Sequence, residues 1–188
     1  MAILILGIGN PIMSDDAIGV RAVEMLRHYY RLPAQVSLVE GGTLGLALLP
    51  QVEDAERLLL VDAVDTGAAP GTLIRLTGAE IPLALQTRIS PHQMGLDDLL
   101  TVAALLGTGP KETVLWGIQP ESLEMSLQLS ASVEAQLETL VEKLLQELAH
   151  WGVTADRICL EGEAGCPKTF RVLSIYRSLY GSADRGLM

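Results

Sequence analysis

Three side chains that could bind a metal ion, Asp16, Asp62 and His92, each lie in a loop after an apolar run of the sequence. Such runs are typical of buried β-strands, and the loops that leave the carboxyl ends of strands in an α/β sheet converge on one edge. Two carboxylates and one imidazole at that edge could bind a divalent metal ion. Because three protein ligands leave coordination positions open, we expect a site that accepts a further ligand.

The elements that must position these side chains are predicted by alternating strand and helix patterns. Within the expected strand 57–61, the four residues after Arg57 are all aliphatic, which favours a central strand. We therefore predict a three-layer, doubly wound α/β domain with a central, mostly parallel five-stranded sheet and helices on both faces. The expected strands are 2–7, 36–39, 57–61, 72–76 and 113–118, and the expected helices are 16–31, 44–49 (stopped at Pro50), 95–106 and one long helix capped by Ser130.

The 188 residues fit one domain over 1–151, followed by an extension of unknown role over 152–188. Glycines, cysteines and mixed charge replace the periodic leucines in this extension, although 170–180 could form one more helix. Cys159 and Cys166 lie close together there and indicate no disulfide framework.

Composition excludes some classes of partner. The formal net charge of -10 argues against nucleic acid and anionic membranes. The first residues carry no basic segment, and Gly7, Gly9 and Pro11 interrupt their apolar run, so no secretory signal is indicated. No stretch approaches the roughly 18 apolar residues of a membrane-spanning helix. We expect a cytoplasmic protein.

Each candidate residue also has a simpler structural interpretation. Acidic residues are common at helix N-termini, where they accept hydrogen bonds from free N–H groups. That role needs only one of two adjacent carboxylates, so we assign capping to Asp15 and metal binding to Asp16. Asp62 follows four aliphatic residues, where burying a carboxylate is costly unless it is paired. His28 and His150 fall on helical patterns, and we expect them to be structural or solvated.

The loops that carry these residues contain further polar and glycine positions. Gly7 and Gly9 allow a tight turn above the end of the first strand. We expect Asn10 to bond neighbouring backbone and fix the loop of Asp16. Gly42 and Thr43 lie where main-chain amides could hold an extended substrate strand.

Five blocks of the sequence, in order and at matching spacing over residues 1–150, resemble the hydrogenase maturation endopeptidases. They are Gly7-Ile8-Gly9-Asn10-Pro11 with Asp15-Asp16-Ala17-Ile18-Gly19-Val20, Glu40-Gly41-Gly42-Thr43, Val61-Asp62-Ala63, Ser90-Pro91-His92 and Gly117-Ile118-Gln119-Pro120.

The resemblance implies removal of the C-terminal extension from the large-subunit precursor of a nickel–iron hydrogenase, after nickel insertion. It also implies that Asp16, Asp62 and His92 recognise nickel, which the substrate carries and which is bound only transiently. Some members have Glu at the first of these positions, and Asp16 is one methylene shorter. We expect the protein to act as a monomer.

Other protease signatures do not fit the sequence. There is no His-Glu-x-x-His helix and no Gly-x-Ser-x-Gly elbow. The tripeptide Asp65-Thr66-Gly67 occurs once, whereas aspartic proteases need two such aspartates in an all-β fold, so we interpret it as chance. Substrate-bound nickel could orient the scissile peptide, or a metal could polarise the carbonyl or activate water, and both routes stay open.

Two other functions remain possible from the sequence. A non-catalytic nickel-sensing chaperone could use the same three residues to hold the precursor without cutting it. A dinucleotide-binding module is suggested by Gly7, Gly9 and Glu40. The third glycine of that fingerprint is replaced by Ile12, and the carboxylates at 15 and 16 would repel a pyrophosphate.

Overall fold

A five-stranded sheet forms the centre of the computed structural model, which describes residues 1–82 and 91–158. The spatial order of its strands is β3-β1-β4-β6-β5, with β5 antiparallel to β6 and the other pairs parallel. The predicted mostly parallel sheet is confirmed, and β4 is its central strand. The strands are β1 (Ile3–Ile8), β3 (Val36–Gly42), β4 (Arg57–Ala63), β5 (Leu73–Thr77) and β6 (Glu112–Ile118).

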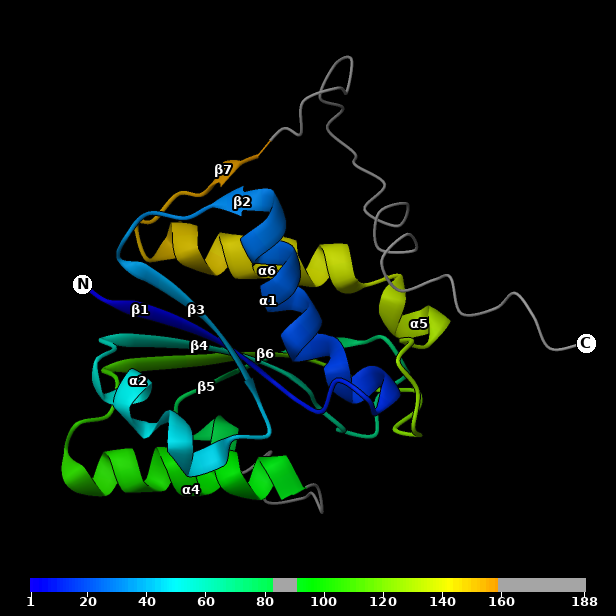
Figure 1. Ribbon diagram of the computed structural model, residues 1–188, viewed down its shortest axis with the longest axis horizontal. Helices are drawn as coiled ribbons and strands as arrows, with labels where there is room; N and C mark the ends of the chain where they lie inside the picture. Colours follow the sequence, from blue (N-terminus) through cyan, green and yellow to red (C-terminus); the bar gives the residue numbers. More distant parts are fainter. Residues whose placement is uncertain (83–90, 159–188) are drawn as a thin grey trace, which may run out of the picture.

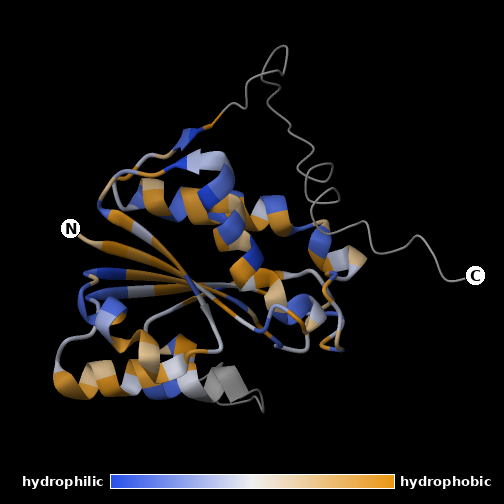
Figure 2. Cartoon of the chain, in the orientation of Figure 1, coloured by the Kyte–Doolittle hydropathy of each residue, from blue (hydrophilic) through white to orange (hydrophobic). Residues whose placement is uncertain are grey.

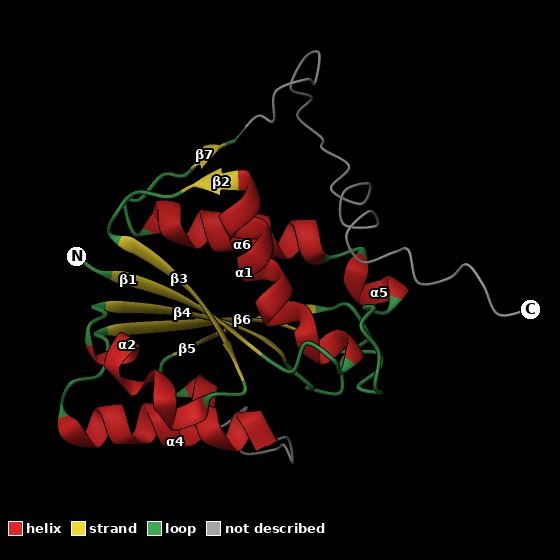
Figure 3. Cartoon of the chain, viewed as in Figure 1, coloured by secondary structure: helices red, strands yellow, loops and turns green. Residues whose placement is uncertain are grey.

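Helices cover both faces of this sheet and complete a three-layer fold (Figure 1, Figure 3). One layer contains α1 (Ile18–Tyr29) and α6 (Leu137–His150), and the other contains α2 (Leu49–Glu53) and α4 (Pro91–Leu106). The short elements are η1 (Ser14–Ala17), β2 (Tyr30–Arg31), η2 (Gly45–Leu48), α5 (Ala131–Glu134) and β7 (Asp156–Arg157).

The two sides of each strand fill two separate hydrophobic cores. Ile3 and Ile5 of β1 pack toward α1 and α6, whereas Leu4 and Leu6 pack toward α2 and α4. A strand covered on both faces reads as a continuous apolar run, because successive side chains alternate between the faces. Figure 2 shows this as hydrophobic colour along the central strands.

Close packing of glycines brings α1 directly onto the sheet. A Cβ atom added at Gly19 would lie 2.1 Å from the carbonyl oxygen of Val61 and 2.3 Å from that of Ile8. A Cβ atom at Gly7 would lie 2.2 Å from the carbonyl oxygen of Gly19. The start of α1 therefore lies against the carboxyl ends of both β1 and β4. Because η1 directly precedes α1, it lies at the same edge of the sheet.

The predictions for Pro50 and for the helix after Ser130 are corrected by the structure. Pro50 does not stop a helix but lies in the first turn of α2, where its missing N–H costs nothing. The expected long helix after Ser130 is divided into α5 and α6. Ser130 does act as a cap, because its Oγ accepts a hydrogen bond from Val133 N at 3.4 Å.

The described part of the predicted extension lies against the domain. Val153 is buried in the core beside α6, and β7 pairs with β2 in a two-stranded antiparallel sheet. Ile158 N donates to the carbonyl oxygen of Tyr29 at 2.8 Å. Cys159, Cys166 and the helix predicted over 170–180 lie outside the described residues. Within 1–82 and 91–158, no helix is both long and apolar enough to cross a bilayer.

Candidate functional site

The strand order places a topological switch point between β1 and β4. The chain continues from β1 to β3 on one side and then returns to β4 on the other side of β1. Ligand sites of α/β sheets form outside the carboxyl ends of strands at such a point. Asp16 follows β1 through η1, and Asp62 is the penultimate residue of β4. Because η1 contacts β4, the two carboxylates are brought to the same edge, as predicted from the sequence.

A tight loop holds Asp16 at this edge. Its Oδ2 accepts a hydrogen bond from Asn10 N at 2.8 Å, and the residue is only 7% exposed. Asn10 Oδ1 in turn accepts from Ile12 N at 3.2 Å, which confirms the predicted role of Asn10 in fixing the loop. Gly9 has φ 122, and a Cβ atom there would lie 1.7 Å from the carbonyl oxygen of Asp16. Only glycine fits this crossing.

Asp62 is completely buried at the end of β4. Its Oδ1 accepts a hydrogen bond from Ala63 N at 2.8 Å. By the two-residue period of a strand, Asp62 points to the same face as Leu58 and Leu60, which pack toward α2 and α4. A carboxylate in this position is costly to desolvate, so packing alone does not account for Asp62.

His92 is the second residue of α4, so the prediction that it lies in a loop directly after a strand is wrong. The preceding strand β5 is antiparallel and ends at the opposite edge of the sheet. The start of α4 nevertheless lies on the side where β1 and β4 end (Figure 1). A Cβ atom at Gly95 would lie 3.0 Å from Gly45 Cα, next to the end of β3. The side chain of His92 is outside the described structure, so its metal role stays a prediction.

Asp15 does not cap a helix, which corrects the sequence prediction. It is completely buried, and η1 has no side-chain cap hydrogen bond within the described residues. The Asp15 carboxylate accepts instead from Glu121 N at 2.8 Å, Ser122 N at 2.9 Å, Ser130 N at 2.7 Å and Ser130 Oγ at 2.8 Å. Asp15 therefore ties the loop after β6 to η1, and Asp16 remains the residue assigned to ligand binding.

Gln119 is a positioning residue for which the sequence predicted no role of its own. Its Oε1 accepts from Thr66 N at 2.7 Å and Ala68 N at 3.2 Å, and its Nε2 donates to Asp65 Oδ1 at 2.8 Å. One buried amide thus fixes the chain that leaves β4 directly after Asp62. The only sequence signal was its place in the block Gly117-Ile118-Gln119-Pro120. Asp65 also accepts from Gly67 N at 3.1 Å, so its carboxylate bonds the turn that follows it.

The other residues named from the sequence are accounted for by local contacts. Glu40 forms an ion pair with Arg27 of α1. Gly42 has φ 51, and its carbonyl oxygen accepts from Gly9 N at 3.1 Å, so the ends of β1 and β3 are bonded together. His28 and His150 are exposed on helices, as expected.

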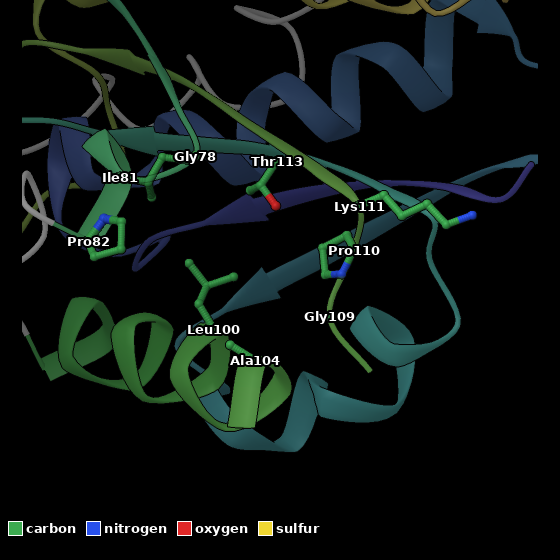
Figure 4. Close-up of a pocket in the computed structure, with 9 residues that line it drawn as sticks. All are labelled: Gly78, Ile81, Pro82, Leu100, Ala104, Gly109, Pro110, Lys111 and Thr113. Carbon is green, nitrogen blue, oxygen red and sulfur yellow. The ribbon is translucent and has the colours of Figure 1, made fainter. Parts of the chain in front are cut away.

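Among the side chains that the structure describes, no group of three or more His, Cys, Asp and Glu residues lies close enough to hold a metal ion. That set does not contain the His92 side chain. A hollow of about 220 Å³ lies elsewhere, between the segment after β5, the second half of α4 and the start of β6 (Figure 4). Its lining is mostly apolar and includes Ile81, Leu100 and Thr113, and it lies at the opposite edge from Asp16 and Asp62.

Comparisons with known proteins agree with this architecture. The family model described as hydrogenase maturation protease (HycI) matches residues 20–147. The hydrogenase 2 maturation protease of Escherichia coli (strain K12) is 45% identical over 125 residues, which are 66% of this chain and 76% of that protein. The hydrogenase expression/formation protein HoxM of Azotobacter vinelandii is 48% identical over 123 residues, or 65% of this chain. That match spans only 59% of the length of HoxM.

Solved structures show the same fold. The E. coli hydrogenase maturating endopeptidase HybD superimposes with a TM-score of 0.81 at 42% identity, covering 84% of this chain and 98% of HybD. The [NiFe] hydrogenase maturation protease HybD from Thermococcus kodakarensis gives a TM-score of 0.65 at 30% identity, covering 79% of this chain and 99% of that chain. With a family model that matches more than half of its length, this chain belongs to the hydrogenase maturation protease family.

Proposed function

We propose that this protein is an endopeptidase that removes the C-terminal extension of a nickel–iron hydrogenase large-subunit precursor after nickel insertion. The observation that carries the proposal is the placement of Asp16 and Asp62 at the switch point between β1 and β4, in a chain of the maturation protease family. In this proposal the substrate's nickel is recognised by Asp16, Asp62 and His92, and the protein acts as a cytoplasmic monomer.

The geometry supports recognition of a cation by fixed acceptors. Asp16 is held by Asn10 N, and Asp62 is buried with one oxygen bonded to Ala63 N. Ionised carboxylates are acceptor-only groups and suit a divalent metal. Because hydrogen bonds to nearby main-chain N–H groups hold both carboxylates in position, the side chains need little rearrangement when the substrate binds. Docking of the substrate's nickel here would place the neighbouring peptide bond in a defined position, and such an orientation effect accelerates bond cleavage.

The test is incubation of the protein with nickel-loaded and nickel-free precursor, followed by mass spectrometry of the precursor's C-terminus. Cleavage of the loaded form alone supports the proposal. Cleavage of both forms would contradict nickel recognition, and binding without cleavage would favour a chaperone. No interaction would mean a different partner.

Matched variants test the three residues. Asp62→Asn and His92→Ala should abolish processing, whereas Asp54→Asn and His28→Ala, which change exposed residues, should not. Asp16→Glu should still process the precursor, because the longer side chain still reaches a metal. Normal processing by either of the first two variants would refute the assignment.

A further inference from the structure

Two neighbouring loops at the edge of the molecule that carries the candidate site expose four large apolar side chains. Ile12 lies in the loop between β1 and η1, and Leu123, Met125 and Leu127 lie in the loop between β6 and α5. Their exposed fractions are 47% for Ile12, 47% for Leu123, 79% for Met125 and 61% for Leu127. We call these four residues the apolar rim. A cluster of exposed apolar residues on a folded protein marks an interaction site.

The rim is built on an ordered backbone. Ser14 N donates to the carbonyl oxygen of Ser126 at 2.8 Å, and Ser126 N donates to that of Ile12 at 3.0 Å, which forms a parallel β-bridge between Met13 and Ser126. Leu123, Met125 and Leu127 are spaced two residues apart around this bridge. The chain bends on both sides of Ser126, so it is this backbone contact, and not a strand period, that brings the loop of Ile12 beside that of Met125 and Leu127.

Polar contacts anchor the inner side of the same loop. Asp15 accepts hydrogen bonds from Glu121 N and Ser122 N, and Ser14 Oγ donates to the carbonyl oxygen of Gln128 at 3.1 Å. Arg21 Nη2 donates to the carbonyl oxygen of Leu127 at 3.4 Å. The backbone groups of the loop are thus directed to the domain while its large side chains remain in water. A preorganised surface of this kind loses little conformational entropy when a partner binds.

The rim is continuous with the candidate site. Met13 directly precedes η1, which carries Asp16, and Asp15 of η1 accepts a hydrogen bond from Ser122 N in the loop of Leu123. The rim therefore adjoins the element that carries Asp16. Exposed Glu124 lies between Leu123 and Met125, so the surface combines apolar contact with negative charge.

We propose that the apolar rim is the docking surface for the hydrogenase large-subunit precursor, and that it contacts an apolar patch of the precursor flanked by basic residues. This inference rests on the proposed function and identifies the surface that brings the substrate to Asp16 and Asp62. The negative charge at Glu124 and the formal net charge of -10 favour the basic flank.

The test compares two double variants of equally exposed residues, with nickel-loaded precursor as substrate. Met125→Ser with Leu127→Ser alters the rim, and Leu105→Ser with Leu106→Ser alters the end of α4 at the opposite edge, where the exposed fractions are 81% and 59%. The rim variant should raise KM about tenfold with little change in kcat, because docking precedes chemistry. The control should match the wild type. Glu124→Lys should also raise KM.

Each other result has a distinct meaning. If the wild type does not cleave the precursor, the proposed function fails. If it does and both double variants keep its KM, only this inference is overturned. Light scattering on the same samples adds a check, because a wild-type dimer that the rim variant converts to monomer would show that a second copy covers the rim.

Discussion

The carboxylate of Asp15 accepts two hydrogen bonds from Ser130, one from its main-chain N–H at 2.7 Å and one from its hydroxyl at 2.8 Å. The two residues are 115 positions apart in the sequence. This contact joins η1, which follows β1, to the loop that follows β6. Of the two neighbouring carboxylates, Asp15 therefore joins the loops of the site edge, and Asp16 is the one that we propose as a ligand.

We predict that Asp15→Asn destabilises the fold by about 2–4 kcal/mol, because one carboxamide cannot accept all four hydrogen bonds and presents N–H groups to donors. Urea unfolding would measure the change. Asp54→Asn, at an exposed position after α2, should stay within about 0.5 kcal/mol of the wild type. Equal midpoints for the two variants would contradict the role assigned to Asp15.

Substitution of Gln119 should impair catalysis more than folding. Gln119→Leu removes the acceptor for Thr66 N and Ala68 N and the donor to Asp65, which loosens the chain directly after Asp62. Residues that orient a metal ligand typically contribute 10- to 100-fold, so we expect kcat/KM on nickel-loaded precursor to fall by about tenfold or more.

The matched control for Gln119 is the exposed Gln51 of α2, whose substitution by Leu should leave kcat/KM unchanged. A melting temperature close to that of the wild type would separate this positioning effect from unfolding. If the Gln119→Leu variant is less stable but its folded molecules keep full activity, the positioning role of Gln119 is refuted.

Gly19→Ala should be strongly destabilising, because its Cβ would lie 2.1 Å from a backbone oxygen of β4 and would push α1 off the sheet. We expect a loss of about 2 kcal/mol or more of unfolding free energy, as for overpacked cores. Gly109→Ala is the control, since the nearest atom to its added Cβ is 3.6 Å away. Thermal unfolding of both variants would test this prediction. Equal melting temperatures for the two variants would contradict the close crossing of α1 over β1 and β4.

An acid-sensitive ion pair stabilises the layer of α6. Arg75 Nε and Nη2 donate to Glu147 at 2.9 and 2.7 Å, and Trp116 Nε1 donates at 3.2 Å. The hydrogen bond from Arg75, as the largest cause, lowers the pKa of Glu147 below its ordinary value of 4.5. A lowered pKa means that the contribution is complete above the pKa of the unfolded chain and is lost as the pH falls through the pKa of the folded protein.

Glu147→Gln should therefore cost about 1–3 kcal/mol at pH 7 and much less near pH 3. Melting temperatures of the wild type and the variant should converge on acidification. A difference in melting temperature that stays constant from pH 7 to 3 would show that ionisation of Glu147 does not contribute to stability.

The local pattern of apolar and polar residues was sufficient to predict the central sheet and the sheet edge at which Asp16 and Asp62 lie. The aliphatic run 58–61 predicted the central strand β4, because the middle of a strand covered on both faces is apolar on both sides. Asp16 and Asp62 were expected at one edge because each follows a buried strand, and the strand order confirms that their strands are neighbours.

Only the tertiary structure revealed the hydrogen-bonding roles of Asp15 and Gln119. It also revealed the antiparallel direction of β5, the position of His92 in a helix and the pairing of β2 with β7. The physical reason is the same for Asp15 and Gln119. Asp15 bonds residues 106 to 115 positions away, and Gln119 bonds residues more than 50 positions away. The period of apolar residues reports which face of an element is buried, but a single hydrogen bond between distant loops leaves no period in the sequence.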